Sequence, residues 1–199
     1  MKKKTLLLVV VLAMVVGFAS FASAKQCYDP YLKGPVGLLY LIEKDAEWNP
    51  VLKGARGWMQ YYIWGEEFSF LFEGHGLVRG EKYTLIYYPD PWPGAGLICL
   101  GEGTAHGWGG NVAIWGRKDL GTDLPADYDK NAVPTPPSGA VGAKIWLVLS
   151  EDVACGTATD PMSSKMIGWN PLEYLFEFNL ITYYDTTTAA DDGPPKKGK

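Results

Sequence analysis

The sequence predicts an all-β protein, an antiparallel β-sandwich of Ig-like or jelly-roll type with about eight strands and long loops. Apolar residues alternate with polar ones in short runs, and 24 glycines and 14 prolines interrupt every longer stretch. Parallel α/β sheets need crossover helices, and no long helical stripe is present. Two antiparallel sheets packed face to face are the remaining way to bury the alternate side chains.

The predicted strands are rich in β-branched and aromatic residues. The alternation is clearest where Phe68, Phe70 and Phe72 fall on one face, since successive strand residues point to opposite sides. In the last run, Tyr174, Phe176 and Phe178 are expected to share a face. The predicted strands, in chain order, are residues 36–43, 58–64, 67–73, 82–88, 97–100, 111–116, 144–149 and 172–181.

Residues 1–24 have the pattern of a secretory signal peptide. Three lysines precede an apolar run from Leu6 to Phe18, and small residues follow at Ala22-Ser23-Ala24. We expect cleavage after Ala24 and a secreted, periplasmic or cell-surface protein without a later membrane span. A retained membrane anchor is the alternative, because the apolar run has nearly the length that a bilayer requires.

The rest of the chain is predicted to form one sandwich domain, residues 25–185, followed by a disordered polar tail, residues 186–199. Residues 118–143 are proline-rich and poor in large apolar groups, so we expect one long surface loop there. The net charge is −4 with no basic cluster, which argues against a nucleic-acid partner.

Three cysteines allow one disulfide, which would persist after export. Cys99 lies in the apolar run Gly-Leu-Ile-Cys-Leu, where a buried free thiol packs as a small hydrophobe. Cys27 and Cys155 lie in polar, turn-rich surroundings. We therefore predict the pair Cys27–Cys155.

The insert Pro89-Asp90-Pro91-Trp92-Pro93-Gly94 separates two apolar runs. Proline fixes φ and favours extended geometry in the preceding residue, so we expect a stiff, extended loop. Either the loop presents Trp92 to a ligand, or Trp92 covers one end of the sandwich.

The eight tryptophans divide into two groups. Four fall in predicted strands and are expected in the core or between strands: Trp58, Trp64, Trp115 and Trp146. Four fall in predicted loops: Trp48, Trp92, Trp108 and Trp169. Aromatic rings stack on sugars, so Trp48, Trp92 and Trp108 are candidate glycan-binding residues if they gather on one exposed face.

Oxygen ligands alternate at Asp127, Asp129 and Asn131, which is the chemistry that calcium prefers. Ala132 stands where an EF-hand requires glycine, so the segment is not an EF-hand. A solvated acidic loop is the alternative, and calcium is the one cofactor that the sequence suggests.

Catalytic motifs are absent from the sequence. No Gly-x-Ser-x-Gly elbow occurs, and Glu66 and Glu67 are neighbours that a strand would point to opposite faces. The two histidines, His75 and His106, are flanked by glycine and predict surface turns rather than a metal site.

These observations favour an exported, non-catalytic β-sandwich that acts as an extracellular or cell-surface binding or structural module for a glycan or protein. Three alternatives stay open. One is a glycan-binding module that uses loop aromatics, and another is a surface subunit that assembles through an exposed strand edge. The least favoured is a secreted metal-dependent enzyme.

Overall fold

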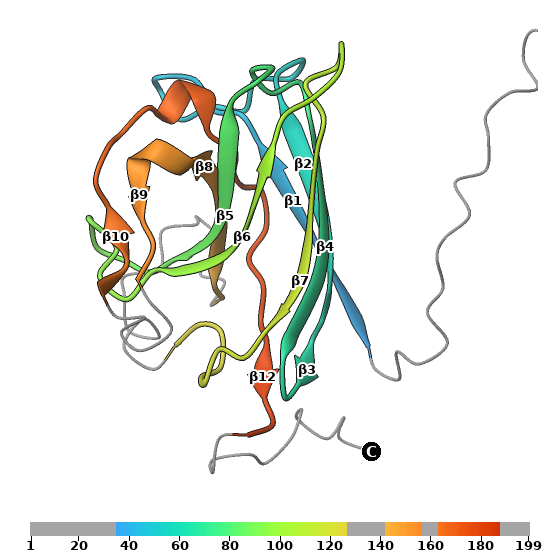
Figure 1. Cartoon of the computed structure of the whole chain (residues 1–199), viewed down its shortest axis with the longest axis vertical. Coiled ribbons are helices and arrows are strands. Elements are labelled where there is room, and N and C mark those ends of the chain that lie inside the picture. Colours follow the sequence, from blue (N-terminus) through green and yellow to red (C-terminus); the bar gives the residue numbers. More distant parts are fainter. Residues whose placement is uncertain (1–34, 127–141, 157–162, 188–199) are drawn as a thin grey trace, which may run out of the picture. The chain divides into compact units, whose positions relative to one another are not determined.

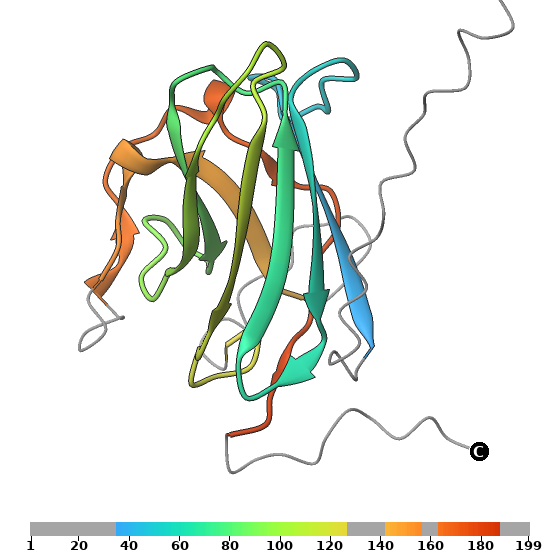
Figure 2. The ribbon, with the colours of Figure 1, turned by 45° about the vertical axis from the view of Figure 1, so that its right-hand side comes forward.

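Two antiparallel sheets face each other in the computed structural model, which describes residues 35–126, 142–156 and 163–187 (Figures 1 and 2). The all-β sandwich prediction is confirmed. The larger sheet has the strand order β11-β1-β2-β4-β7. Its strands are β1 Val36–Ile42, β2 Arg56–Tyr62, β4 Phe68–His75, β7 Val112–Lys118 and the short β11 Phe176–Glu177.

The smaller sheet has the order β6-β5-β8, with β5 Lys82–Tyr88 in its centre. Its neighbours are β6 Ile98–Thr104 and β8 Lys144–Leu149. Two further pairs complete the described elements. They are β9 Val153–Ala154 with β10 Lys165–Met166, and β3 Trp64–Gly65 in a parallel pair with β12 Tyr184–Asp185. The single-turn 3-10 helices η1 Ser150–Asp152 and η3 Pro171–Glu173 lie beside the sheets.

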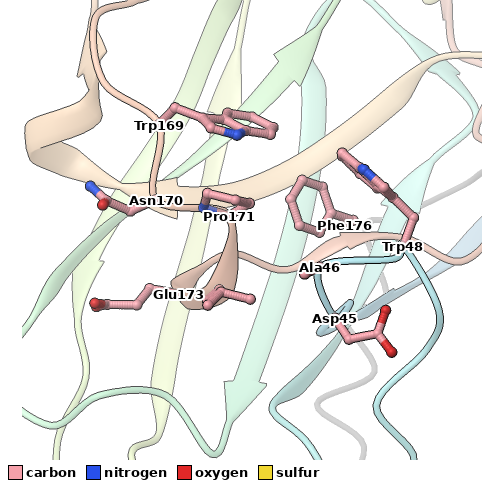
Figure 3. Close-up of a pocket in the computed structure, with 9 residues that line it drawn as sticks. Asp45, Ala46, Trp48, Trp169, Asn170, Pro171, Glu173 and Phe176 are labelled. Atoms are coloured by element: carbon pink, nitrogen blue, oxygen red, sulfur yellow. The ribbon is translucent and has the colours of Figure 1, made fainter.

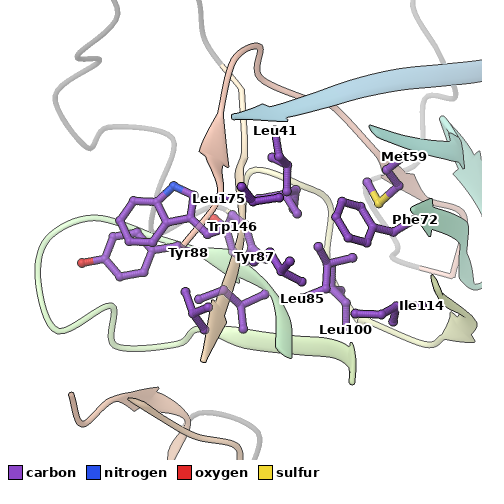
Figure 4. Close-up of a cluster of buried hydrophobic side chains, with 14 of the residues drawn as sticks. Leu41, Met59, Phe72, Leu85, Tyr87, Tyr88, Leu100, Ile114, Trp146 and Leu175 are labelled. Atoms are coloured by element: carbon purple, nitrogen blue, oxygen red, sulfur yellow. The ribbon is translucent and has the colours of Figure 1, made fainter. Parts of the chain in front are cut away.

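The core lies between the sheets, where alternate side chains meet (Figure 4). Phe68, Phe70 and Phe72 of β4 are buried on one face, as predicted. In β1, Leu39 and Leu41 point inward while their neighbours point outward. Strand alternation therefore decides which side chains of the larger sheet enter the core.

Two strands of the smaller sheet, β5 and β8, are buried on both faces, whereas the edge strand β6 is only partly covered. In β5, every residue after Lys82 is buried, and the elements η1, β9, β10 and η3 lie over the outer face of these strands (Figure 1). Thr84 Oγ1 lies 2.8 Å from Ser150 Oγ, and the Tyr88 ring stacks on Trp146 with centroids 3.9 Å apart. Trp146 is thus an internal residue, as predicted from its place in a strand.

The predicted strand over residues 172–181 is wrong in extent. Leu175 pairs with Leu147 of β8, and the next two residues pair with β1, so the chain crosses from one sheet to the other. Because of this crossing the side chains do not keep one alternation. Tyr174, Leu175 and Phe176 are all buried, whereas Phe178 is 67% exposed beside Tyr40.

The predicted Cys27–Cys155 pair is wrong, since the disulfide joins Cys99 to Cys155 with their Cα atoms 5.8 Å apart. Cys99 lies in β6, an edge strand of the smaller sheet, where its side chain is only partly covered. The apolar residues that flank Cys99 in the sequence therefore do not imply that its side chain is fully buried. The bond ties β6 to the end of the β9 segment.

Several predictions fall on residues outside the described ranges. These are the signal peptide at residues 1–24, Cys27, the calcium ligands Asp127, Asp129 and Asn131, and most of the tail. The structure describes only the two ends of the expected 118–143 loop, and there Leu124 is buried and pairs with Tyr183. The tail begins with a defined contact, in which Thr186 N donates to Gly65 O. Within the described ranges, no helix has the length and apolar character needed to cross a membrane.

Candidate aromatic binding groove

The tripeptide Trp-Asn-Pro occurs twice, at residues 48–50 and 169–171. The first copy lies in the loop between β1 and β2, and the second leads directly into η3. Trp48 of the first copy and all three residues of the second copy line one groove (Figure 3). A proline biases the preceding residue, here the asparagine, away from helical geometry, so the chain around each tripeptide forms a turn.

The β1–β2 loop fixes Trp48 in a left-handed backbone conformation, with φ at 65°. This conformation is uncommon for a bulky residue and is stabilised here by the loop itself. The Asp45 Oδ1 atom accepts hydrogen bonds from Glu47 N at 3.0 Å and Asn49 N at 2.8 Å, and Trp48 N donates to Asp45 O. The Trp48 side chain remains 51% exposed.

Asp152 holds the second Trp-Asn-Pro turn in place through hydrogen bonds. Its Oδ2 atom accepts hydrogen bonds from Tyr174 Oη at 2.5 Å and Asn170 Nδ2 at 2.8 Å, and its carbonyl accepts from Gly168 N. A Cβ atom on Gly168 would lie 1.9 Å from Asp152 Oδ1, so only glycine fits there. Burial raises the pKa of Tyr174 above its ordinary value, and the bond to Asp152 raises it further. The hydroxyl therefore stays protonated and continues to donate.

The groove has a volume of about 460 Å³, and its walls are aromatic. The Trp48 and Trp169 rings lie 6.2 Å apart at an angle of 32°, and the Trp48 ring lies 4.9 Å from Phe176. Polar residues also line the groove, namely Asp45, Asn170 and Glu173 (Figure 3). Mostly apolar walls with a few polar groups are typical of small-molecule sites.

Trp92 extends the aromatic surface beyond the groove. Its ring lies 5.3 Å from Trp169 in an edge-to-face arrangement, and 52% of the side chain is exposed. The Trp92 insert is a compact turn rather than the extended loop that the sequence predicts, since Gly94 N donates to Pro91 O. Met166 N also donates to Pro93 O, which joins this turn to the segment that carries Trp169.

A lysine lies beside the groove, next to two of its aromatic rings. Lys44 Nζ lies 5.4 Å from the Trp48 ring centroid and 5.5 Å from that of Phe176. It forms an ion pair with Glu177 at 3.7 Å, and Glu177 also accepts a hydrogen bond from Trp146 Nε1. A cation already faces these rings, so a second cationic group is disfavoured there.

A second ion pair fixes the Trp92 turn. Lys144, the first residue of β8, bonds to Asp90. Burial lowers the pKa of Lys144, and the nearby Lys44 lowers it further while Glu177 opposes the shift. The turn is therefore anchored to the smaller sheet just before its tryptophan.

Two of the three predicted ligand-binding tryptophans come together. Trp48 and Trp92 both contact Trp169, whereas Trp108 is fully exposed at the turn between β6 and β7 and does not belong to this cluster. The sequence reasoning placed Trp169 in a loop but did not choose it, and it missed Asp45, Glu173 and Phe176. The repeated Trp-Asn-Pro tripeptide is the signal that would have found the groove.

The outer face of the larger sheet is the other exposed aromatic surface. We use that name for the side chains of Leu38, Tyr40, Leu71, Trp115 and Phe178. The strand register places Leu38, Gln60, Leu71 and Trp115 in one row across the sheet. Trp115 is 76% exposed, which corrects the prediction that its strand position would bury it.

Metal sites receive no support from the part of the chain that the structure describes, which contains no suitable group of three or more His, Cys, Asp or Glu residues. His75 and His106 are both exposed, and His75 Nδ1 lies 2.9 Å from Asn111 Oδ1. The calcium prediction at residues 127–131 stays a prediction.

Comparison with known proteins adds no relative, because no family model, no curated protein and no solved structure matches this chain. The fold and the groove are therefore the basis for any statement about function.

Proposed function

We propose that the protein is an exported, non-catalytic glycan-binding protein whose ligand binds in the aromatic groove. The observation that carries the proposal is the meeting of the two Trp-Asn-Pro turns across one groove. Their rings offer flat apolar surfaces to the C–H groups of a sugar, and Trp48 and Trp169 both remain exposed enough to be reached.

The polar groups of the groove suit sugar hydroxyls. The Asp45 and Glu173 carboxylates accept hydrogen bonds, and the Asn170 side-chain amide can donate or accept. An aromatic site for a quaternary ammonium ligand is the closest competing chemistry. The position of Lys44 behind Trp48 and Phe176 argues against that ligand.

Two features support export. Residues 1–24 have the composition of a secretory signal. The Cys99–Cys155 disulfide is of a kind that persists in oxidising compartments. Both agree with a protein that meets glycans outside the cytosol.

The test is calorimetric titration and tryptophan fluorescence with oligosaccharides built from glucose, galactose and N-acetylglucosamine. We expect one series to bind, and we expect Trp48→Ala and Trp169→Ala each to weaken binding by about tenfold or more, as for aromatic residues at the centre of a site. Trp108→Ala is the matched control, because it removes an exposed tryptophan outside the groove.

Binding that survives both groove substitutions, or that Trp108→Ala weakens equally, would place the ligand elsewhere. Absence of binding to every sugar would reject the proposal. Circular dichroism of each variant establishes that the fold is intact.

A further inference from the structure

We infer that the binding surface continues from the groove across Trp169 to Trp92, and that it accepts an oligosaccharide of two or more sugar residues and rejects acidic chains. This inference rests on the proposed glycan binding. It adds a second subsite, at Trp92, and a charge preference.

The arrangement of the rings supports two subsites. Trp169 lies between Trp48 and Trp92, with centroid separations of 6.2 Å and 5.3 Å. These spacings are comparable to the length of one pyranose residue. The Trp48 and Trp169 ring planes are inclined by only 32° to each other, and Trp92 stands at 78° to Trp169. A first sugar residue can rest against the Trp48 and Trp169 rings while the next rests on Trp92.

The Trp92 turn is fixed in place by contacts with neighbouring segments, so it is preorganised to bind a sugar residue. It is fixed to β8 by the Lys144–Asp90 ion pair and to the Trp169 segment by the Met166–Pro93 hydrogen bond. Gly94, with φ at 73°, packs against the Tyr88 ring so closely that an added Cβ would lie 2.6 Å from it. An exposed ring on a fixed turn loses little conformational entropy when a ligand binds.

The charged groups that line the groove disfavour the binding of acidic sugars. The described residues that line it include the carboxylates of Asp45 and Glu173 and no cation. Lys44 lies close by, but its side chain is only 16% exposed and is paired with Glu177. Uronate groups entering the groove would meet like charges at close range.

The test measures dissociation constants for mono-, di- and trisaccharides of the series that binds best. We expect the trisaccharide to bind about tenfold or more tighter than the monosaccharide. Trp92→Ala is expected to remove this gain, so that the trisaccharide binds no tighter than the monosaccharide to this variant. Trp92→Phe should restore most of the gain, and Trp108→Ala should change neither affinity.

Equal affinity for the monosaccharide and the trisaccharide would overturn the second subsite, and so would a Trp92→Ala variant that loses affinity for both to the same extent. These outcomes differ from failure of the proposed function, in which no sugar of any length binds.

The charge preference is tested at low salt with the matching uronic acid trisaccharide. We expect its affinity to be about tenfold or more below that of the neutral trisaccharide, and we expect Glu173→Gln to narrow the difference. Equal affinity of the two trisaccharides for the wild-type protein would overturn this part of the inference.

Discussion

The aromatic groove and the outer face of the larger sheet both expose large aromatic side chains, yet they are built in different ways. On the outer face, hydrogen-bonded register alone sets the positions of Leu38, Leu71 and Trp115. In the groove, turns distant in sequence bring Trp48 and Trp169 together beside carboxylates. Exposure of a tryptophan is therefore a poor guide to a site, and convergence with polar groups is a better one.

The groove depends on a few cross-links, and the larger sheet does not depend on them. The Asp152 hydrogen bonds hold the segment that carries Trp169, the Lys144–Asp90 ion pair holds the adjacent Trp92 turn, and the Cys99–Cys155 disulfide ties β6 to the end of β9. The following predictions use this difference, from the largest expected effect to the smallest.

Removal of the disulfide has the largest expected effect. The double variant Cys99→Ala, Cys155→Ala should lower the free energy of unfolding by about 2–4 kcal/mol, because the bond closes a loop of 56 residues in the unfolded chain. Urea denaturation measures the change. Cys27→Ser is the matched control and should leave stability unchanged. Loss of stability in the control alone would contradict the pairing.

Substitution of Asp152 comes next. Asp152→Ala leaves the buried Tyr174 hydroxyl without its acceptor, which costs about 1–3 kcal/mol, and it also removes a hydrogen bond of the exposed Asn170 amide. We expect lower stability in urea and a change in the tryptophan fluorescence of the protein. Asp152→Asn keeps one acceptor oxygen and should recover part of the stability. An Ala variant as stable as the wild type would show that Asp152 does not hold this segment.

Alkaline pH should lower the free energy of unfolding by a smaller amount, through the buried Tyr88. Burial raises the pKa of Tyr88 to about 12 in the folded protein, against an ordinary value of 10.0. Between these values the unfolded chain loses a proton that the folded protein keeps, so stability is full below pH 10 and falls as the pH rises toward 12.

Melting temperatures measured from pH 8 to pH 11.5 test this expectation. Tyr88→Phe, which cannot ionise, should show a shallower decline than the wild type. Identical declines in the two proteins would mean that Tyr88 does not contribute to the pH dependence.

The smallest effect is expected on the outer face. Trp115→Ser removes a side chain that is 76% exposed, so the free energy of unfolding should change by about 0.5 kcal/mol or less. Glycan affinity should stay the same, while binding of a hydrophobic dye should fall because an exposed apolar patch becomes smaller. Loss of glycan affinity in this variant would erase the functional distinction between the two regions.

The sequence pattern predicted the longer strands well. The bounds of β5 and β8 match the predicted runs, and Phe68, Phe70 and Phe72 point inward. Trp115 shows the limit of this reasoning, because a strand pattern says that two faces exist but not that the outer one is covered. Its own β7 alternation, with Val112 and Ile114 buried, places it outside.

The candidate site was predicted only in part for a related reason. Trp48 and Trp92 were chosen because they lie in loops, but Trp108 satisfies the same condition and lies apart from the groove. The cysteine pair failed similarly, since the polarity of nearby residues does not determine which two Cβ atoms come within bonding range.

The sequence by itself determined the class of fold and the inward residues of the longer strands, because side-chain direction in a strand repeats every two residues. Only the tertiary structure decided that two Trp-Asn-Pro turns share one groove and that Cys99 pairs with Cys155. These contacts join residues far apart along the chain. They depend on how the sheets pack and where the chain crosses between them, which no local pattern encodes.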